Sequence, residues 1–376
     1  METETTLQNL YSTQGQSPWL DNIKRSYLTS GKLANLVDRG IRGVTSNPTI
    51  FAKSIEESSD YDEQFFDLLS THSVEEAYWE IAKDDITQAL DVLGSLYKSS
   101  SGGDGFVSIE VGPHLAYDVA GTISEARQLH GAINRKNLLV KIPATIEGLK
   151  AIEQMISEGV SINVTLIFSL ERYAHVIDAY IAGLEKYVNS GATREDVSRV
   201  SSVASFFVSR VDTEIDRRLD QIAAASPQNS PQLQSLAGKA AVAQARLAYK
   251  LFLDKFSGQR WESLAAMGAR VQRPLWASTS TKNPAYPDLK YVDNLIGPDT
   301  VNTMPDQTVD AFLDHGTVSR KIDVDFEGAQ RDLDNLSSVG IDLPDVVKVL
   351  EDEGVASFTK SFDELMQVLT DKASQR

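Results

Sequence analysis

A lysine within a predicted buried strand is the residue with the most distinctive chemistry. Lys141 lies between Val140 and Ile142, in an apolar segment that Pro143 follows. Burial disfavours the charged form of a lysine, and the neutral amine can attack a ketone to form a Schiff base. The protonated imine withdraws electrons, so the bond between the third and fourth carbons of a ketose can break in a retro-aldol step. The structural alternative for Lys141 is an ion pair.

Polar residues in or after other apolar segments could complete this chemistry. A retro-aldol step needs an acid or base at the C4 hydroxyl, groups that orient the sugar hydroxyls and, for a sugar phosphate, a cationic clamp. Asp21 or Glu110 could act at the C4 hydroxyl. Arg210 could bind the phosphate together with Lys282. The candidates for the orienting groups are Asn47, Asn163, Thr165 and Ser205. This set needs neither a metal ion nor an organic cofactor.

Several of these residues also have a purely structural interpretation. Asn47 directly precedes Pro48, a pattern that is typical of the start of a helix. Thr165 is a good strand former and Ser205 a small core residue, so either could serve packing alone. Arg210 could pair with an acidic residue two or four positions further along the chain. The functional interpretation therefore depends on all of these residues meeting in one place.

The composition excludes several kinds of functional site and of binding partner. The chain of 376 residues contains no cysteine, which excludes thiolate metal sites and cysteine nucleophiles. The five histidines lack metal-binding spacing, and no G-x-S-x-G motif indicates a serine hydrolase. A formal net charge of −17 argues against binding to nucleic acids or anionic membranes. Because the first residues are polar and no apolar segment is long enough to span a membrane, we expect a cytoplasmic location.

Short apolar segments alternate with longer amphipathic ones along the chain. The predicted strands are Trp19–Ile23, Gly43–Ser46, Phe106–Val111, Leu138–Ile142, Ser161–Phe168, Val200–Val208, Pro274–Ser278 and Thr300–Met304. The predicted helices between them include Ser124–Arg135, Ile146–Glu158, Leu170–Ser190 and Pro231–Phe256. This alternation indicates a parallel sheet, and eight units predict a (β/α)₈ barrel. An open doubly wound sheet is the alternative, but the chain has no G-x-G-x-x-G turn.

The spacing of the predicted strands is uneven, and we expect a single domain over residues 1–376 that carries extra helices. Two or three helices without a strand are predicted over residues of about 48–100, and a helical tail over about 323–376. A break at Gly340–Val347 should start the last helix. The sequence assigns no role to the tail, and it leaves open whether the protein is a monomer or a homodimer.

The segments that carry the candidate residues resemble those of the transaldolase family. They are Gly43–Phe51 (GVTSNPTIF), Val107–Asp118 (VSIEVGPHLAYD), Leu138–Thr145 (LLVKIPAT), Ile162–Ser169 (INVTLIFS), Ser205–Asp212 (SFFVSRVD) and Trp276–Pro284 (WASTSTKNP). The length and the STSTKNP form resemble the longer bacterial branch. The resemblance implies a (β/α)₈ barrel that moves a dihydroxyacetone unit between sugar phosphates of the pentose phosphate pathway. The donor would be sedoheptulose 7-phosphate or fructose 6-phosphate, and the acceptor glyceraldehyde 3-phosphate or erythrose 4-phosphate.

The resemblance also implies a role for each matching residue. Lys141 would form the Schiff base, and Asp21 would be the acid or base at the C4 hydroxyl. Glu110 would position or activate a water molecule during imine formation. The residues that orient this water and the dihydroxyacetone moiety would be Asn47, Asn163, Thr165 and Ser205. Arg210 would hold the phosphate with Lys282. Many shorter family members have an arginine where this chain has the longer ASTSTKNP segment, so Ser278 and Ser280 are further candidates for phosphate binding.

Two other functions are weighed against this transferase. The first is an aldolase of the same mechanism that releases dihydroxyacetone to water instead of passing it to an acceptor. The second is a catalytically silent barrel that binds sugar phosphates or acts as a scaffold. Lys141 disfavours the silent barrel, because a binding protein has little reason to bury an amine.

Overall fold

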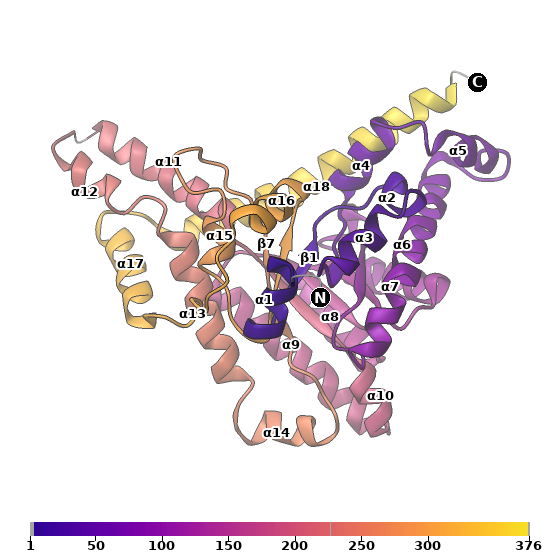
Figure 1. The fold of residues 1–376 in the computed structure, drawn as a ribbon, viewed down its shortest axis with the longest axis horizontal. Coiled ribbons are helices and arrows are strands. Elements are labelled where there is room, and N and C mark those ends of the chain that lie inside the picture. Colours follow the sequence, from indigo (N-terminus) through magenta and orange to yellow (C-terminus); the bar gives the residue numbers. More distant parts are fainter. Residues whose placement is uncertain (1–3, 226, 375–376) are drawn as a thin grey trace.

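The computed structural model, which describes residues 4–225 and 227–374, contains a closed barrel of parallel strands in the order β1 to β8 (Figure 1). The strands are β1 Gln16–Leu20, β2 Gly43–Val44, β3 Phe106–Glu110, β4 Leu138–Pro143, β5 Ile162–Ile167, β6 Ser202–Phe207, β7 Arg273–Ala277 and β8 Thr300–Met304. Each predicted strand overlaps one of them, and β1 pairs with β8 to close the sheet. The predicted (β/α)₈ barrel is confirmed, and the open doubly wound alternative is wrong.

Helices surround the barrel and fill the long interval between β2 and β3. They are α1 Thr6–Gln14, α2 Arg25–Thr29, α3 Lys32–Asp38, α4 Pro48–Glu56, α5 Asp62–Leu68, α6 Val74–Ser99, α7 Val119–Ile133, α8 Ile146–Ser157, α9 Leu170–Asn189, α10 Arg194–Arg199, α11 Ser209–Ala225, α12 Ser230–Gln234, α13 Ala240–Lys255, α14 Gly258–Ala266, α15 Lys290–Asp293, α16 Asp306–His315, α17 Phe326–Ser338 and α18 Leu343–Ser374, with short 3₁₀ turns η1 Pro113–Leu115 and η2 Pro227–Asn229. The helix α18 begins inside the predicted break at Gly340–Val347.

The first strand lies earlier in the chain than its apolar pattern predicts. The prediction was Trp19–Ile23, but β1 ends at Leu20. The polar residues Gln16 and Ser17 open the strand and are fully buried, because the Gln16 amide and the Ser17 hydroxyl donate hydrogen bonds to tertiary partners. The Gln16 amide donates to the Leu295 carbonyl at 2.7 Å, for example. Asp21 therefore follows the strand instead of interrupting it.

The predicted long helix Pro231–Phe256 is wrong, because the structure divides this segment into α12 and α13. Gly238 lies between the two helices with φ of +70°, in the left-handed region that glycine tolerates. Its backbone N–H donates to the Asp216 carboxylate at 2.8 Å, outside any helical pattern. Apolar periodicity continues through the turn, which is why the sequence suggested one helix.

The lower part of the barrel interior is filled by a large aromatic side chain. Trp19 points inward from β1 and is fully buried, with its ring centroid 6.3 Å from that of Phe106. Gly43 of β2 faces the same ring, and a Cβ atom there would lie 2.4 Å from it. A side chain at position 43 would therefore displace the tryptophan. Trp19 therefore fills this level of the barrel interior.

The helix α18 crosses the carboxyl-terminal ends of the strands (Figure 1, yellow). It packs against α4, α6, α11 and β5, elements that are far apart in the chain. Gly354 of α18 lies so close to β5 that a Cβ atom would be 3.1 Å from Leu166. The helix α18 thus covers one side of the strand ends.

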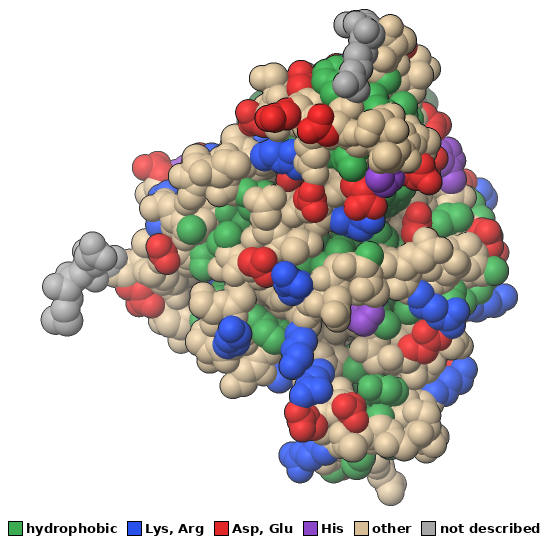
Figure 2. Space-filling model, turned by 90° about the vertical axis from the view of Figure 1, so that its right-hand side faces the viewer, with side chains coloured by type: hydrophobic (Ala, Val, Ile, Leu, Met, Phe, Trp, Pro, Cys, Tyr) green, Lys and Arg blue, Asp and Glu red, His purple; other side chains and the backbone are tan. Residues whose placement is uncertain are grey.

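Acidic and basic side chains are interspersed over the face shown in Figure 2.

Candidate functional site

A cavity of about 200 Å³ lies at the carboxyl-terminal ends of the strands, where barrel enzymes place their active sites. Its lining residues come from or directly follow most of the strands, and one comes from α18. They are Asp21, Thr45, Asn47, Lys141, Thr165, Ser205, Phe207, Arg210, Ala277, Ser278, Ser280, Lys282, Thr303, Pro305, Gln307 and Phe358. Most of the residues that the sequence selected therefore meet in one cavity, whereas Glu110 and Asn163 lie just outside its lining.

Lys141 projects inward from β4, and its side chain is only 6% exposed. Its Nζ donates to the Glu110 carboxylate at 3.1 Å and to the Ser46 carbonyl at 3.0 Å. The centroid of the Phe358 ring lies 5.6 Å from the same nitrogen. The register of the sheet explains the pair, because Glu110 of β3 lies directly beside Lys141 of β4. The structural ion pair considered from the sequence is present, but it lies at the edge of the cavity.

Two carboxyl groups lie near this amine, and burial raises the pKa of both. For Glu110, the neighbouring Lys141 opposes that rise and the charge of Asp21 adds to it. For Asp21, the Thr45 hydroxyl donates a hydrogen bond at 2.7 Å, which favours the carboxylate and lowers the pKa. The charges of Lys141 and Lys282 act in the same direction on Asp21. Both groups are thus placed to exchange protons.

Three polar side chains form a chain inside the barrel, next to the cavity. The Ser205 hydroxyl donates to the Asn163 side-chain carbonyl at 2.7 Å, and the Asn163 amide donates to the Ser108 hydroxyl at 3.0 Å. Asn163 is completely buried, so it can orient Ser205 but does not line the cavity itself. Thr165, two residues along the same strand, lines the cavity and has a buried hydroxyl without a hydrogen-bond partner among the described residues.

Cationic side chains gather at one side of the cavity. Arg210 forms no ion pair with Asp212 or Glu214 in the described part of the chain, because those carboxylates pair with Lys290 and with two other arginines. Burial lowers the pKa of Arg210. Burial also lowers the pKa of Lys282, and the charge of Arg210 adds to that effect. Their mutual repulsion favours an anion between them.

Hydroxyl groups accompany these cations. The Lys282 amine donates to the Ser280 hydroxyl at 2.6 Å. The Ser278 hydroxyl shares a hydrogen bond of 2.9 Å with Ser209, and its φ of +56° turns the chain sharply after β7. The longer segment after β7 thereby brings an amine and two hydroxyls to the cavity, where a phosphate could bind.

Asn47 fits both of its interpretations. Its side-chain oxygen accepts a hydrogen bond of 3.0 Å from the Ile50 backbone and caps α4. The same side chain also lines the cavity. A helix cap and a substrate contact are therefore compatible at this position.

The sequence reasoning missed several lining residues. The hydroxyls of Thr45 and Thr303 share a hydrogen bond of 2.7 Å, and the two residues come from the end of β2 and from β8, the neighbours of β1. Strand alternation puts Thr45 on the same side as Gly43, two positions earlier. Gln307 follows β8 at the start of α16. Phe358 lies about 50 positions further along, in the tail to which the sequence assigned no role. No local pattern links it to the barrel.

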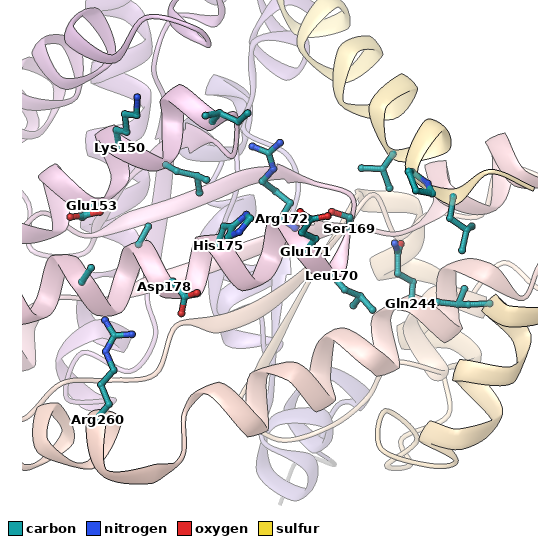
Figure 3. Close-up of a pocket in the computed structure, with 18 residues that line it drawn as sticks. Lys150, Glu153, Ser169, Leu170, Glu171, Arg172, His175, Asp178, Gln244 and Arg260 are labelled. Carbon is teal, nitrogen blue, oxygen red and sulfur yellow. The ribbon is translucent and has the colours of Figure 1, made fainter. Parts of the chain in front are cut away.

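A second and larger cavity, of about 930 Å³, lies away from Lys141 on the outside of the barrel (Figure 3). Figure 3 shows Lys150, His175, Gln244 and Arg260 spread along it. Several of its charged groups are paired with residues outside the lining, as Arg260 is with Glu185 at 2.7 Å. Ser169 and His175 line it, but the Ser169 hydroxyl caps α9, where it accepts from the Arg172 backbone at 3.0 Å. The smaller cavity, with a buried lysine beside a carboxylate, is therefore the candidate active site.

Among residues 4–225 and 227–374, no group of three or more histidines and carboxylates is arranged to hold a metal ion. The helices of this described part include none with the length and apolar character needed to cross a bilayer.

Comparisons with known proteins agree with the motifs of the chain. A family model described as Transaldolase/Fructose-6-phosphate aldolase matches residues 18–369. The chain is 49% identical over 378 residues to a protein named transaldolase from Saccharopolyspora erythraea, with 100% of both chains covered. A transaldolase of Thermobifida fusca is 51% identical over 358 residues, which are 94% of this chain and 95% of that protein. One of Mycolicibacterium smegmatis is 48% identical and covers 94% of each chain.

Proposed function

Because the chain belongs to the transaldolase family, we propose that this transferase moves a dihydroxyacetone unit between sugar phosphates through a Schiff base on Lys141. The observation that carries the proposal is the buried contact between the Lys141 amine and the Glu110 carboxylate, 3.1 Å apart, at the edge of a cavity that also contains Asp21. The donor would be sedoheptulose 7-phosphate or fructose 6-phosphate. The acceptor would be glyceraldehyde 3-phosphate or erythrose 4-phosphate, with the reaction in the pentose phosphate pathway.

The first half of the reaction would form and cleave the imine. Glu110 can accept a proton from the lysine, because burial raises its pKa. The free amine then attacks the ketone carbon, and loss of water gives the protonated imine. Glu110, with Thr165, would position the water that leaves here and returns at the end. Asp21 would take the proton of the C4 hydroxyl while the C3–C4 bond breaks and its electrons move into the imine.

The second half would transfer the three-carbon unit. The nucleophilic carbon of the enamine attacks the aldehyde of the acceptor, and Asp21 returns its proton to the new hydroxyl. Asn47 and Ser205 would bind the hydroxyls of the dihydroxyacetone moiety, with Asn163 fixing the orientation of Ser205. Arg210 and Lys282, with Ser278 or Ser280 beside them, would bind the phosphate of the sugar. These cations would then form a local positive site in a protein whose net charge is −17.

Reductive trapping tests the nucleophile directly. Fructose 6-phosphate with borohydride should attach a reduced dihydroxyacetone unit to the peptide that contains Lys141, as mass spectrometry would show. Lys141→Arg should abolish the adduct, and Lys136→Arg should keep it, because Lys136 lies before β4 rather than at the cavity. An adduct on Lys136, or none on either lysine, would refute the mechanism.

The runner-up is an aldolase that releases dihydroxyacetone to water. The description of the matching family model also names fructose-6-phosphate aldolase, which is the reason to test for this activity. Product formation from fructose 6-phosphate with and without an aldose phosphate separates the two functions. We expect turnover to depend on the acceptor.

A further inference from the structure

An aromatic ring from the carboxyl-terminal helix forms part of the wall beside the candidate nucleophile. Phe358 lies in the middle of α18, is 6% exposed and lines the same cavity as Lys141. Its ring centroid is 5.6 Å from the Lys141 nitrogen, within the range of a cation–π contact. Most of the other lining groups near this amine are polar, so the ring supplies an apolar, water-excluding surface there.

Contacts on both sides of Phe358 fix α18 over the barrel. Before it, Glu351 forms an ion pair of 3.2 Å with Arg172, in which both side chains are largely buried. After it, the Thr49 hydroxyl donates to that of Ser361 at 2.9 Å and joins α18 to α4. Nearer the end of α18, Lys372 pairs with Asp62 of α5. The ring is therefore held in place by the contacts that α18 makes with other elements.

The proposed reaction produces an intermediate with two possible fates. After C3–C4 cleavage, the enamine on Lys141 can attack the aldehyde carbon of an acceptor, which forms a C–C bond. It can instead take a proton on the same carbon to give the imine, after which one water adds to the imine carbon and the C–N bond breaks. That second path releases dihydroxyacetone and returns the protonated amine. The release path needs a proton and a water molecule at the imine, whereas the transfer path needs neither before the acceptor arrives.

We infer that Phe358 is a specificity residue that favours transfer over release, by keeping bulk water, which would supply the proton that release requires, away from the intermediate on Lys141. This inference rests on the proposed function. The π face of the ring also stabilises the positive charge of the imine before cleavage. The tail helix thus has a role that its sequence did not indicate: it carries the side chain that protects the intermediate until an aldose phosphate arrives.

The test compares two variants of α18. Phe358→Leu removes the ring, and Leu365→Ala removes buried carbon atoms two turns further along the same helix, away from the cavity. Each protein receives fructose 6-phosphate with and without erythrose 4-phosphate, and free dihydroxyacetone and transfer product are measured. We expect the ratio of release to transfer to rise about tenfold in Phe358→Leu, since water access and loss of the cation–π contact act together. Leu365→Ala should leave the ratio within about twofold of the parent.

Three outcomes would overturn the inference. The first is an unchanged ratio in Phe358→Leu, and the second is an equal loss of both activities in that variant. The third is an equal rise of the ratio in Leu365→Ala, which would mean that the position of the helix, and not the ring, controls the ratio. If Phe358→Leu does not fold, Phe358→Met keeps most of the side-chain volume without the rigid ring and should raise the ratio by a smaller factor, because it still excludes part of the water. Borohydride trapping on Lys141 of the parent protein separates this failure from failure of the proposed function, because the parent forms the adduct whatever the role of Phe358 and forms none if the Schiff-base mechanism is wrong.

Discussion

The two ends of the barrel both bury charged side chains, but they satisfy them differently. At the amino-terminal end, the Asp104 carboxylate is 1% exposed and accepts hydrogen bonds from Ser17 at 2.7 Å, Arg42 at 2.8 Å and Arg273 at 3.1 Å. Arg273 also donates to Ser17 at 2.9 Å. The carboxylate and its donors form a closed set within the fold.

At the carboxyl-terminal end, the pairing is incomplete. Lys141 has Glu110 beside it, but Thr165 keeps a buried hydroxyl without a partner, and Arg210 makes no ion pair among the described residues. Unpaired buried polar groups cost stability, and beside a cavity a bound ligand can supply the missing partners. The closed polar cluster thus stabilises this barrel, whereas the open one is available to bind a ligand.

Breaking the closed cluster should have the largest effect, and the effect should be on stability. Asp104→Asn leaves Arg42 and Arg273 without their anion, which costs about 3–5 kcal/mol of the free energy of unfolding. Urea unfolding would measure this loss. Activity per folded molecule should not change at 25 °C, because Asp104 lies away from the cavity.

A surface pair is the matched control for this substitution. Asp91 pairs with Arg135 at 2.9 Å, but both side chains are substantially exposed. Asp91→Asn should therefore cost less than about 1 kcal/mol. Equal losses at Asp91 and Asp104 would contradict the distinction between a closed buried cluster and an ordinary salt bridge.

Removing a cation from the open cluster should affect binding more than folding. Arg210→Ala should raise the KM for phosphorylated substrates by about 10- to 150-fold, which corresponds to the 1.5–3 kcal/mol of a charge-assisted hydrogen bond. Steady-state kinetics with fructose 6-phosphate and with unphosphorylated fructose would check it. Arg217→Ala on the same helix, whose exposed guanidinium pairs with the buried Glu214, should leave the KM unchanged. Equal losses with both sugars would disprove the phosphate assignment.

The smallest expected effect is a shift in pH dependence. Thr45→Val removes the hydroxyl that donates to Asp21 and keeps the shape of the side chain. The carboxylate loses a stabilising donor, so the pKa of Asp21, which burial already raises, should rise further. If Asp21 must be ionised to accept the C4 proton, the acid limb of kcat/KM moves to higher pH. Thr303→Val removes a hydroxyl that bonds to Thr45 and should shift it less. A shift to lower pH would contradict the assignment of Asp21 as the base.

Most of the fold and the centre of the site were predictable because they depend on local patterns. Buried parallel strands require apolar residues, so charged residues such as Lys141 and Glu110 stand out within them. The adjacent register of β3 and β4 then brings the two together. The start of β1 differs from the prediction for the same reason, because Gln16 is polar in sequence but buried in the fold, where its amide donates to the Leu295 carbonyl and the Thr300 hydroxyl.

The turn at Gly238 and the role of α18 depend on contacts that no local pattern encodes. Gly238 breaks a continuous apolar periodicity because its backbone bonds to Asp216, which lies on another helix. Phe358 reaches the cavity only because ion pairs and close packing carry α18 across the strand ends. Helical periodicity tells which face of α18 is apolar, but it does not tell which part of the barrel that face covers.

The sequence by itself determined the eight alternating units, the absence of thiol chemistry and the lysine in the fourth strand. These follow from residue types and from periods of two and 3.6, which act over a few residues. Only the tertiary structure decided that the buried charges divide into a closed cluster at one end of the barrel and an open one at the other. Hydrogen-bond satisfaction depends on partners up to several hundred residues apart, as between Ser17 and Arg273, and those distances are set when the barrel closes.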